Sequence, residues 1–336
     1  MTDLKTTYLG LKLKNPIIAG SCNLSTDHDV LKRLEDSGAA AVVYKSLFEE
    51  QIQLERYQMD EDLGEYAERS AEMLSIFPNL EHAGPQEHLE NLSKAKSVLG
   101  IPLIASLNAV YKESWVDYAQ QLEQTGVDAL ELNFYSIPNK FDKDSKTIEL
   151  EQIDIIKAIL GKVKIPVSVK LSLYYTNPLN FIKQVDDLGV KGFVFFNKLF
   201  QPEINIEDEK HITPWNLSEP NDKRVPLRFA GVLYSRIKAQ ICSSTGIFEG
   251  KDVAAMILAG ADAVQVVSTL YRNKPEHIAK MLEDLTAWME KKDYSNLESF
   301  RGKLSAATLN DPFIYKRAQY VDALLGSNSL LKKVQL

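Results

Sequence analysis

Four short apolar segments of this chain end in a polar side chain that could bind a ligand. These side chains are Lys45, Asn133, Lys170 and Asn197. A lysine that closes an apolar strand is costly to bury unless it meets a charge or a cofactor. One such lysine could simply extend into solvent, but two lysines and two asparagines in equivalent positions make coincidence a poor explanation. We therefore predict that the four side chains surround a site for a polar or charged ligand.

The segment 131–139, with the sequence ELNFYSIPN, continues one of these strand ends into a loop. It adds a second asparagine, Asn139, and the hydroxyl groups of Tyr135 and Ser136. A strand end that presents amides and hydroxyls together is where a barrel enzyme would hold its substrate and a general base. We therefore expect the reacting part of a substrate to lie against this segment.

A second kind of site follows two later apolar segments. Residues 243–247 read SSTGI, and residues 267–270 read VSTL. In barrels, the loops after strands 7 and 8 commonly form a phosphate cradle from backbone N–H groups and hydroxyls at a helix N-terminus. Helix capping alone would also explain the serines and threonines. The position of both motifs in the chain favours a phosphate site.

Eight apolar or β-branched segments would form the strands that position these groups, with amphipathic segments between most of them. The predicted strands are residues 15–20, 40–45, 101–106, 128–133, 165–170, 191–197, 238–243 and 262–267. The predicted helices are residues 27–37, 114–125, 150–160, 178–188 and 251–259. Several helices end at a glycine that precedes a new strand, as at Gly38 and Gly189. Eight such units predict an α/β fold of the closed (β/α)8 TIM-barrel type, because an open doubly wound sheet would carry GxGxxG after its first strand.

Two segments are too long to be simple connections between a strand and a helix. Residues 46–100 follow the second strand, and the polar, proline-rich residues 198–231 follow the sixth. Long loops after strands are the active-site loops of this fold, so both are candidates for a lid or a substrate loop. We expect one domain over residues 1–336, with the barrel at about 7–290 and a helical C-terminal extension at 291–336.

Composition excludes several classes of function. A chain of 336 residues that is 45% hydrophobic can bury a large core, and its net charge of −7 disfavours nucleic acid or an anionic membrane as a partner. The two cysteines lie far apart, which indicates a reducing compartment and no zinc or iron–sulfur site of the chain's own. Residues 1–12 are polar, so we expect no signal peptide, and no apolar run is long enough to span a membrane. We therefore expect a cytoplasmic protein.

The chain resembles the dihydroorotate dehydrogenases, which are FMN-dependent barrel enzymes, over about residues 7–290. The order and spacing of the matching pieces are specific, although no single piece is. The pieces are LGLKLKNP at 9–16 leading into AGS at 19–21, YKS at 44–46, ELN at 131–133 with PN at 138–139, VKL at 169–171, Asn197, TGI at 245–247 and ST at 268–269.

This resemblance implies a cofactor, a reaction and a set of site residues. The enzyme would move a hydride from a CH–CH bond next to a carbonyl to flavin N5, as in the oxidation of dihydroorotate to orotate in pyrimidine biosynthesis. The substrate would be held by Lys45, Asn133, Asn139 and Asn197, and Lys170 would lie by the flavin ring and stabilise its reduced anion. The residues that would hold FMN are Ala19, Gly20, Lys45, Ser46, Asn133, Lys170, Gly231, Thr245, Gly246, Ser268 and Thr269.

The chain departs from the family's pattern on the substrate side. The family places its base, Cys or Ser, directly before the Pro-Asn pair, where this chain has Ile137 after one extra residue. Ser136 is the nearest hydroxyl and Tyr135 the next, and either would need a loop environment or a water relay to act. Met73 replaces a substrate-binding asparagine, and Lys198 replaces the usual Ser or Thr after Asn197. We therefore expect the flavin half of the site to be better preserved than the substrate half.

The electron acceptor and two other functions stay open at this point. Quinone-linked relatives carry an N-terminal amphipathic extension, whereas this chain begins almost directly at the barrel; NAD-linked relatives use an iron–sulfur flavoprotein partner. A soluble acceptor such as fumarate is a third option, and we expect a homodimer. The alternatives are a Schiff-base aldolase or lyase that uses Lys170 as its nucleophile, and a non-catalytic flavin subunit of a redox complex.

Overall fold

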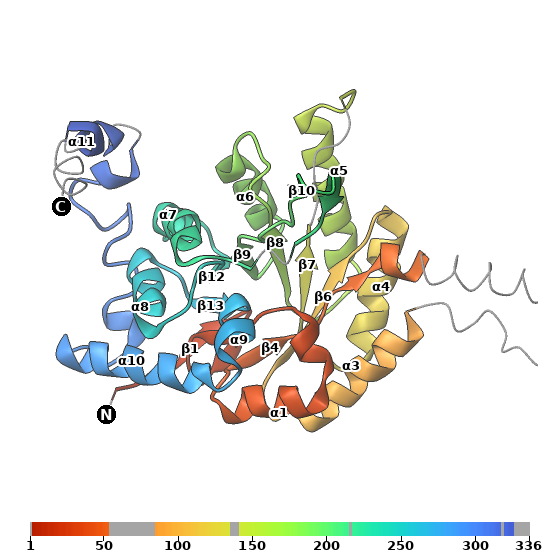
Figure 1. The fold of residues 1–336 in the computed structure, drawn as a ribbon, viewed down its shortest axis with the longest axis horizontal. Helices are drawn as coiled ribbons and strands as arrows, with labels where there is room; N and C mark the ends of the chain where they lie inside the picture. The colour runs from red at the N-terminus through yellow and green to blue at the C-terminus, as the bar shows by residue number, and fades with distance from the viewer. Residues whose placement is uncertain (1, 54–84, 135–140, 215–216, 317–318, 326–336) are drawn as a thin grey trace, which may run out of the picture.

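Eight parallel strands close into a barrel in the computed structural model, which describes residues 2–53, 85–134, 141–214, 217–316 and 319–325 (Figure 1). The strands follow one another around the barrel in chain order, and the last pairs with the first through Val266 and Ala19. They are β3 (Ile17–Ala19), β4 (Ala41–Val43), β6 (Leu103–Asn108), β7 (Ala129–Asn133), β8 (Val167–Leu171), β9 (Gly192–Phe195), β12 (Gln240–Ser244) and β13 (Ala263–Val266). The predicted (β/α)8 barrel is confirmed.

Helices surround the barrel, and five of them match the prediction. The first turn of some of them is capped by a side chain; for example, the Asp27 carboxylate accepts hydrogen bonds from the backbone N–H groups of Asp29 and Val30. Two of the glycines that follow them adopt the left-handed conformation, with φ of +100° at Gly38 and +97° at Gly189. The five helices are α1 (His28–Asp36), α4 (Lys112–Gln124), α5 (Ser145–Leu160), α6 (Pro178–Asp187) and α8 (Gly250–Ala259).

Two further barrel helices lie inside segments that the sequence pattern assigned to long loops. Helix α3 (Gln86–Val98) buries only Leu92 and Ala95, so its apolar face is too narrow to stand out in the sequence. Helix α7 (Arg224–Leu233) has Pro226 in its first turn, where proline is tolerated because that N–H has no partner within the helix. Residues 198–231 are therefore not one loop, and the prediction was wrong for their last part.

A β-hairpin closes the barrel at the N-terminal ends of its strands. It consists of β1 (Thr6–Tyr8) and β2 (Leu11–Leu13), and the buried side chains of Tyr8 and Leu9 pack with residues that point into the barrel. A Cβ atom on Gly192 would lie 2.6 Å from Leu9 Cδ2, so this strand needs glycine where the hairpin docks. Because the hairpin fills this end of the barrel, a ligand can bind only at the opposite end, where the strands finish.

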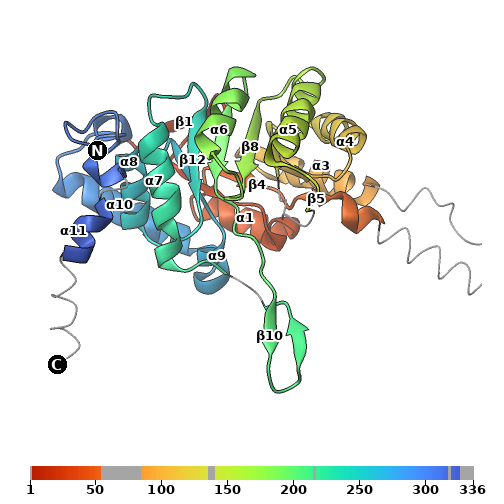
Figure 2. The same ribbon diagram turned by 90° about the horizontal axis from the view of Figure 1, so that it is seen from above.

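The remaining elements lie at the edges of the barrel. A second hairpin, formed by β10 (Glu203–Asn205) and β11 (Lys210–Ile212), projects away from the body of the molecule (Figure 2). The described part of the extension after the barrel contains α11 and is otherwise built of short 3-10 helices and turns. The other elements are β5 (Leu47–Phe48), η1 (Asn23–Thr26), η3 (Pro220–Lys223), α9 (Ser268–Asn273), α10 (His277–Lys291), η4 (Leu297–Ser299), η5 (Phe313–Tyr315) and α11 (Gln319–Leu325).

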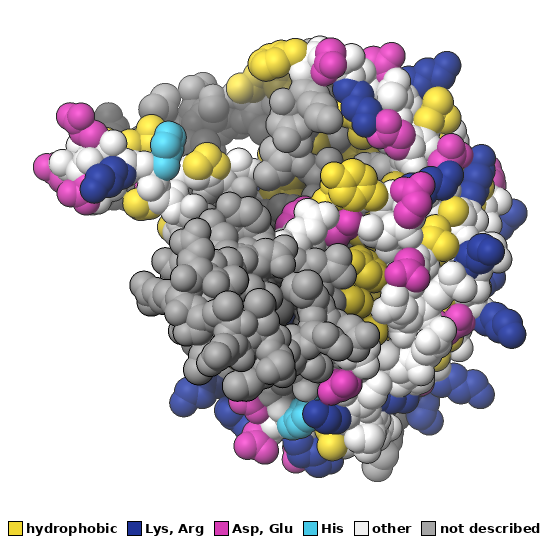
Figure 3. All heavy atoms as spheres, turned by 90° about the vertical axis from the view of Figure 1, so that its right-hand side faces the viewer, with side chains coloured by type: hydrophobic (Ala, Val, Ile, Leu, Met, Phe, Trp, Pro, Cys, Tyr) yellow, Lys and Arg dark blue, Asp and Glu magenta, His cyan; other side chains and the backbone are white. Residues whose placement is uncertain are grey.

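Charged side chains of both signs are interspersed over the described part of the face in Figure 3. Acidic residues exceed basic ones in the whole chain, 46 to 39. Within the ranges that the structure describes, none of the helices combines the length and the apolar character that crossing a lipid bilayer requires.

Candidate active site

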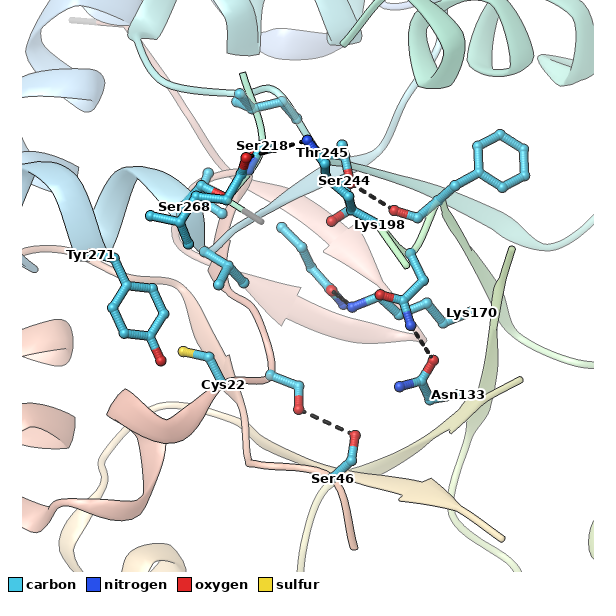
Figure 4. A pocket seen from close by; sticks show the side chains of 18 of the residues that line it. Cys22, Ser46, Asn133, Lys170, Lys198, Ser218, Ser244, Thr245, Ser268 and Tyr271 are labelled. Carbon is cyan, nitrogen blue, oxygen red and sulfur yellow. Dashed lines mark hydrogen bonds between the residues drawn. The ribbon is translucent and has the colours of Figure 1, made fainter. Parts of the chain in front are cut away.

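A cavity of about 360 Å³ opens at the C-terminal ends of the barrel strands, a size typical of small-molecule and cofactor sites (Figure 4). It lies where a TIM barrel keeps its active site. Nine residues singled out from the sequence line it: Lys45, Ser46, Asn133, Lys170, Asn197, Lys198, Thr245, Gly246 and Ser268.

Four other predicted site residues do not line the cavity. Ala19 and Gly20 lie in and directly after β3, and Thr269 is buried and donates a hydrogen bond to the backbone of Phe248. Gly231 lies in α7, where a Cβ atom would approach within 2.1 Å of the Tyr315 hydroxyl. The structure therefore assigns Gly231 to packing against the C-terminal extension, and we do not include it in the site.

Four residues of interest cannot be placed. Ser136, Tyr135, Asn139 and Met73 lie outside the described residues.

The floor of the cavity is a buried polar network that spans three strands. Lys170 on β8 donates a hydrogen bond to Gln265 Oε1 on β13 at 3.1 Å, and Gln265 Nε2 donates to Glu131 Oε2 on β7 at 2.5 Å. Lys170 Nζ lies 3.5 Å from the other carboxylate oxygen of Glu131. Because side chains alternate along a strand, Glu131 comes one layer below Asn133, which is the register partner of Lys170. The sequence pattern gave no role to Glu131 or Gln265.

Two amide side chains stand at the same end of the barrel, held in fixed orientations. Asn197 Nδ2 donates a hydrogen bond to Asn133 Oδ1 at 2.8 Å, and Asn108 Nδ2 donates to the Asn133 carbonyl at 2.8 Å. Asn108 ends β6 and was not predicted. These contacts bring Asn133 and Asn197 together as the sequence pattern predicted, and they leave polar amide groups to meet a substrate.

Lys45 supplies a positive charge at the cavity that no described carboxylate pairs with. It is half-buried and lies beside a chain of hydroxyls, in which Ser46 Oγ is 2.6 Å from Ser106 Oγ and 3.3 Å from Ser21 Oγ. Burial, together with the positive charge of Lys45, lowers the pKa of His88 to about 4. An unpaired cation in a partly desolvated position favours an anionic ligand.

The opposite side of the cavity is rich in hydrogen-bond donors (Figure 4). Gly246, with φ of +75°, directs its N–H to Ser218 Oγ at 3.2 Å, and Ser268 Oγ accepts hydrogen bonds from the N–H and the hydroxyl of Ser218. The hydroxyl of Thr245 donates to the carbonyl of Phe196 at 2.8 Å. Backbone N–H groups and hydroxyls gathered around a left-handed glycine suit phosphate oxygens. Ser218 was missed by the sequence pattern.

Lys198, which departs from the family pattern, makes contacts of its own. Its ammonium donates hydrogen bonds to Asp222 Oδ2 at 2.7 Å and to the Leu217 carbonyl at 3.2 Å. Although burial opposes ionisation, the hydrogen bond from Lys198 lowers the pKa of Asp222. Lys198 therefore ties the end of β9 to the segment that carries Ser218.

Comparisons with known proteins find similar chains among enzymes that oxidise or reduce small molecules. A family model described as dihydroorotate dehydrogenase matches residues 3–289. The catalytic subunit of dihydroorotate dehydrogenase B (NAD(+)) from Thermoplasma volcanium is 28% identical over 312 residues, which cover 90% of this chain and 98% of the relative. The same subunit from Methanocaldococcus jannaschii is 27% identical, covering 86% and 94%. Chloroplastic dihydropyrimidine dehydrogenase (NADP(+)) from Arabidopsis thaliana is 26% identical, covering 89% and 76%.

Proposed function

The chain belongs to the dihydroorotate dehydrogenase family and is an oxidoreductase that acts on CH–CH donors, and we propose that it does so with bound FMN. The observation that carries the proposal is a single cavity that joins two complementary ends. Lys170 lies at one end, and the N–H group of Gly246 lies with Ser218 and Ser268 at the other.

The residues present fit FMN. The donors around Gly246 would hold the phosphate. The hydroxyls of Ser218 and Ser268, which now bond to each other, could instead donate to a phosphate oxygen, together with the N–H group of Gly246. Lys170 would lie against the isoalloxazine ring and stabilise negative charge on it. Bound FMN would supply the acceptor for the hydride, which no amino-acid side chain can provide.

The chain's own residues would bind and orient the substrate. Lys45 would pair with a carboxylate, since it is a cation at the cavity without a described partner. Asn133 and Asn197, fixed by their mutual hydrogen bond, would meet the amide and carbonyl groups of a dihydropyrimidine ring. Asn139 would complete this set, and Ser136, or Tyr135 in its place, would remove the proton next to the carbon that gives up the hydride.

We propose dihydroorotate or a related dihydropyrimidine as the substrate. A dihydroorotate dehydrogenase and a dihydropyrimidine dehydrogenase both match the chain over most of its length. Lys198 is engaged with Asp222, so the position where the family has a substrate-binding hydroxyl serves a different contact here. The match to the family over residues 3–289 favours this oxidoreductase over the Schiff-base aldolase.

The electrons that the flavin takes from the substrate must pass on to a further acceptor. The relatives include catalytic subunits of NAD(+)-linked enzymes, which supports a soluble acceptor or a separate redox partner. We propose that the enzyme works in the cytoplasm as a homodimer.

The test is a spectrum followed by an anaerobic titration. Purified protein should show the visible absorption bands of oxidised flavin and release FMN on denaturation; colourless protein that binds no added FMN would refute the proposal. Anaerobic addition of dihydroorotate or dihydrouracil should then bleach the bands. Bleaching by only one of them identifies the substrate, and flavin that neither compound reduces would support the non-catalytic flavin subunit.

A further inference from the structure

Glu131 is a buried carboxylate whose two oxygens differ in their hydrogen bonding. The side chain is 1% exposed. Oε2 accepts a hydrogen bond from Gln265, whereas Oε1 accepts none from any described residue and is paired with the Lys170 ammonium at 3.5 Å. Burying a carboxylate is costly unless it is paired and hydrogen-bonded, so an incompletely satisfied one calls for an explanation.

The ion pair between Glu131 and Lys170 is bridged by an amide. A separation of 3.5 Å exceeds the usual range for a hydrogen bond between nitrogen and oxygen, whereas the Lys170 ammonium donates a hydrogen bond to Gln265 Oε1 at 3.1 Å. Gln265 is thus hydrogen-bonded to both charged groups. Lys170 stays on the lining of the cavity while Glu131 compensates its charge from the layer below.

The charge of Glu131 acts across the barrel interior. Burial raises the pKa of the Cys242 thiol well above its usual range, and the next cause is the negative charge of Glu131. Cys242 lies on β12, and Glu131 lies on β7. A negative charge that develops at the cavity floor would be opposed by the same field, because like charges repel and both groups are buried.

We propose that Glu131 is a positioning residue that holds Lys170 through Gln265 and that lowers the reduction potential of the bound flavin, because its negative charge offsets the positive charge of Lys170. The inference rests on the proposed binding of FMN. Bound flavin would take up a hydride, which carries two electrons and one proton, so that its ring would gain one negative charge. Lys170 favours that charge and Glu131 disfavours it, so the pair sets the balance between them.

The test replaces the carboxylate by an amide of the same shape, Glu131→Gln, in the FMN-loaded enzyme. Sulfite adds to oxidised flavin and leaves negative charge on the ring, so its affinity reports the same stabilisation without any substrate. We expect sulfite to bind about tenfold more tightly, and the midpoint potential to rise by about 30 mV, which is a tenfold change in the equilibrium constant of a two-electron couple. Lys170→Met should shift both quantities in the opposite direction.

Two further variants separate this role from a purely structural one. Glu131→Asp keeps the charge but withdraws it by one methylene, so sulfite affinity should fall between the wild type and Glu131→Gln; this variant serves if the amide variant does not fold. Asp186→Asn removes another buried carboxylate, 3% exposed, which accepts hydrogen bonds from the backbone N–H groups of Lys238 and Ala239 at the other end of the barrel. It should lower stability without changing sulfite affinity.

The outcomes distinguish the two proposals. Protein that binds no FMN refutes the proposed function itself. Glu131→Gln protein that binds FMN but keeps the wild-type sulfite affinity and midpoint potential, or shifts them downward, overturns the role of Glu131 and leaves the proposed function standing.

Discussion

Lys198 Nζ lies 2.7 Å from Asp222 Oδ2, and this ion pair joins the end of barrel strand β9 to the segment that carries Ser218. Both side chains are only partly exposed, 27% and 34%. Lys198 also donates to the carbonyl of Leu217, the residue next to Ser218. A lysine in the place of a substrate-binding hydroxyl thus positions the proposed phosphate site.

The ion pair between Lys198 and Asp222 should support the binding of FMN. Lys198→Met should weaken FMN binding by about tenfold, because Ser218 loses the contact that holds its segment at the cradle. Titration of the apoprotein into FMN, followed by flavin fluorescence, measures the affinity. Lys183→Met is the matched control, since it removes an i,i+4 pair with Asp187 that lies on the surface of α6. Equal FMN affinity in Lys198→Met and wild type would show that the pair does not support the cradle.

Gly246 provides a sharper test of the cradle. In Gly246→Ala, the new Cβ would lie 2.3 Å from the backbone nitrogen of Lys223, in addition to the strain of a φ of +75°. We expect FMN affinity to fall by roughly 100-fold or more, because the backbone around the N–H group must shift. Gly126→Ala is the control: φ is +83° there, but nothing lies within 4 Å of the added atom. It should cost about 1 kcal/mol of stability and leave FMN affinity unchanged.

The architecture could be predicted because its determinants are local. Strands buried on both faces are nearly continuous apolar runs, and each of the eight barrel strands falls within or close to its predicted range. Lys45, Asn133, Lys170 and Asn197 were found for the same reason, since a polar residue at the end of such a run is easily seen.

The rest of the site depends on contacts between distant residues. Ser218 reaches Gly246 and Ser268 across 28 and 50 residues, inside a segment that looks like a loop. Glu131 and Gln265 lie within strands, where a single polar residue gives no sign of its partner across the barrel. Gly231 was carried over from the resemblance, but its neighbour is Tyr315, which is 84 positions later in the chain and outside the matched residues.

Lys45 is predicted to recognise the anionic end of the substrate. Lys45→Met should weaken binding of orotate by about 10- to 100-fold, because a charge-assisted hydrogen bond is lost in a partly buried place. The change that orotate causes in the flavin spectrum measures its affinity, and Lys45→Arg should recover most of it. Unchanged orotate binding in Lys45→Met would exclude this residue from substrate recognition.

Ser136 is predicted to be the base. Ser136→Ala should slow the anaerobic reduction of the flavin by substrate by about 100-fold or more, with FMN retained, because proton removal from the substrate loses its acceptor. Stopped-flow absorbance of the flavin measures the rate. The comparison variant is Tyr135→Phe, which removes the neighbouring hydroxyl. If Tyr135→Phe is slow and Ser136→Ala is fast, the base is Tyr135.

Protonation of His88 should make the stability of the protein depend on pH. The ring of His88 packs edge-on against Tyr44, with centroids 5.4 Å apart. Its pKa is about 4 in the folded protein, because of burial and then Lys45, against 6.5 for an ordinary histidine. Between these values the unfolded chain binds a proton that the folded protein does not, so stability falls as the pH drops from about 6.5 to about 4. The loss should reach at most about 3 kcal/mol and then level off at lower pH.

The variant His88→Phe keeps the aromatic contact and removes the titration, so urea unfolding of the apoprotein at a series of pH values should show a smaller loss over this window. Lys45→Met should have a weaker effect in the same direction, because removing that positive charge raises the pKa of His88 toward its ordinary value. A reduced pH dependence of stability in Lys45→Met is the most informative result, because it would show that the positive charge of Lys45 contributes to the low pKa of His88. An identical pH dependence in the wild type and His88→Phe would mean that other groups cause it.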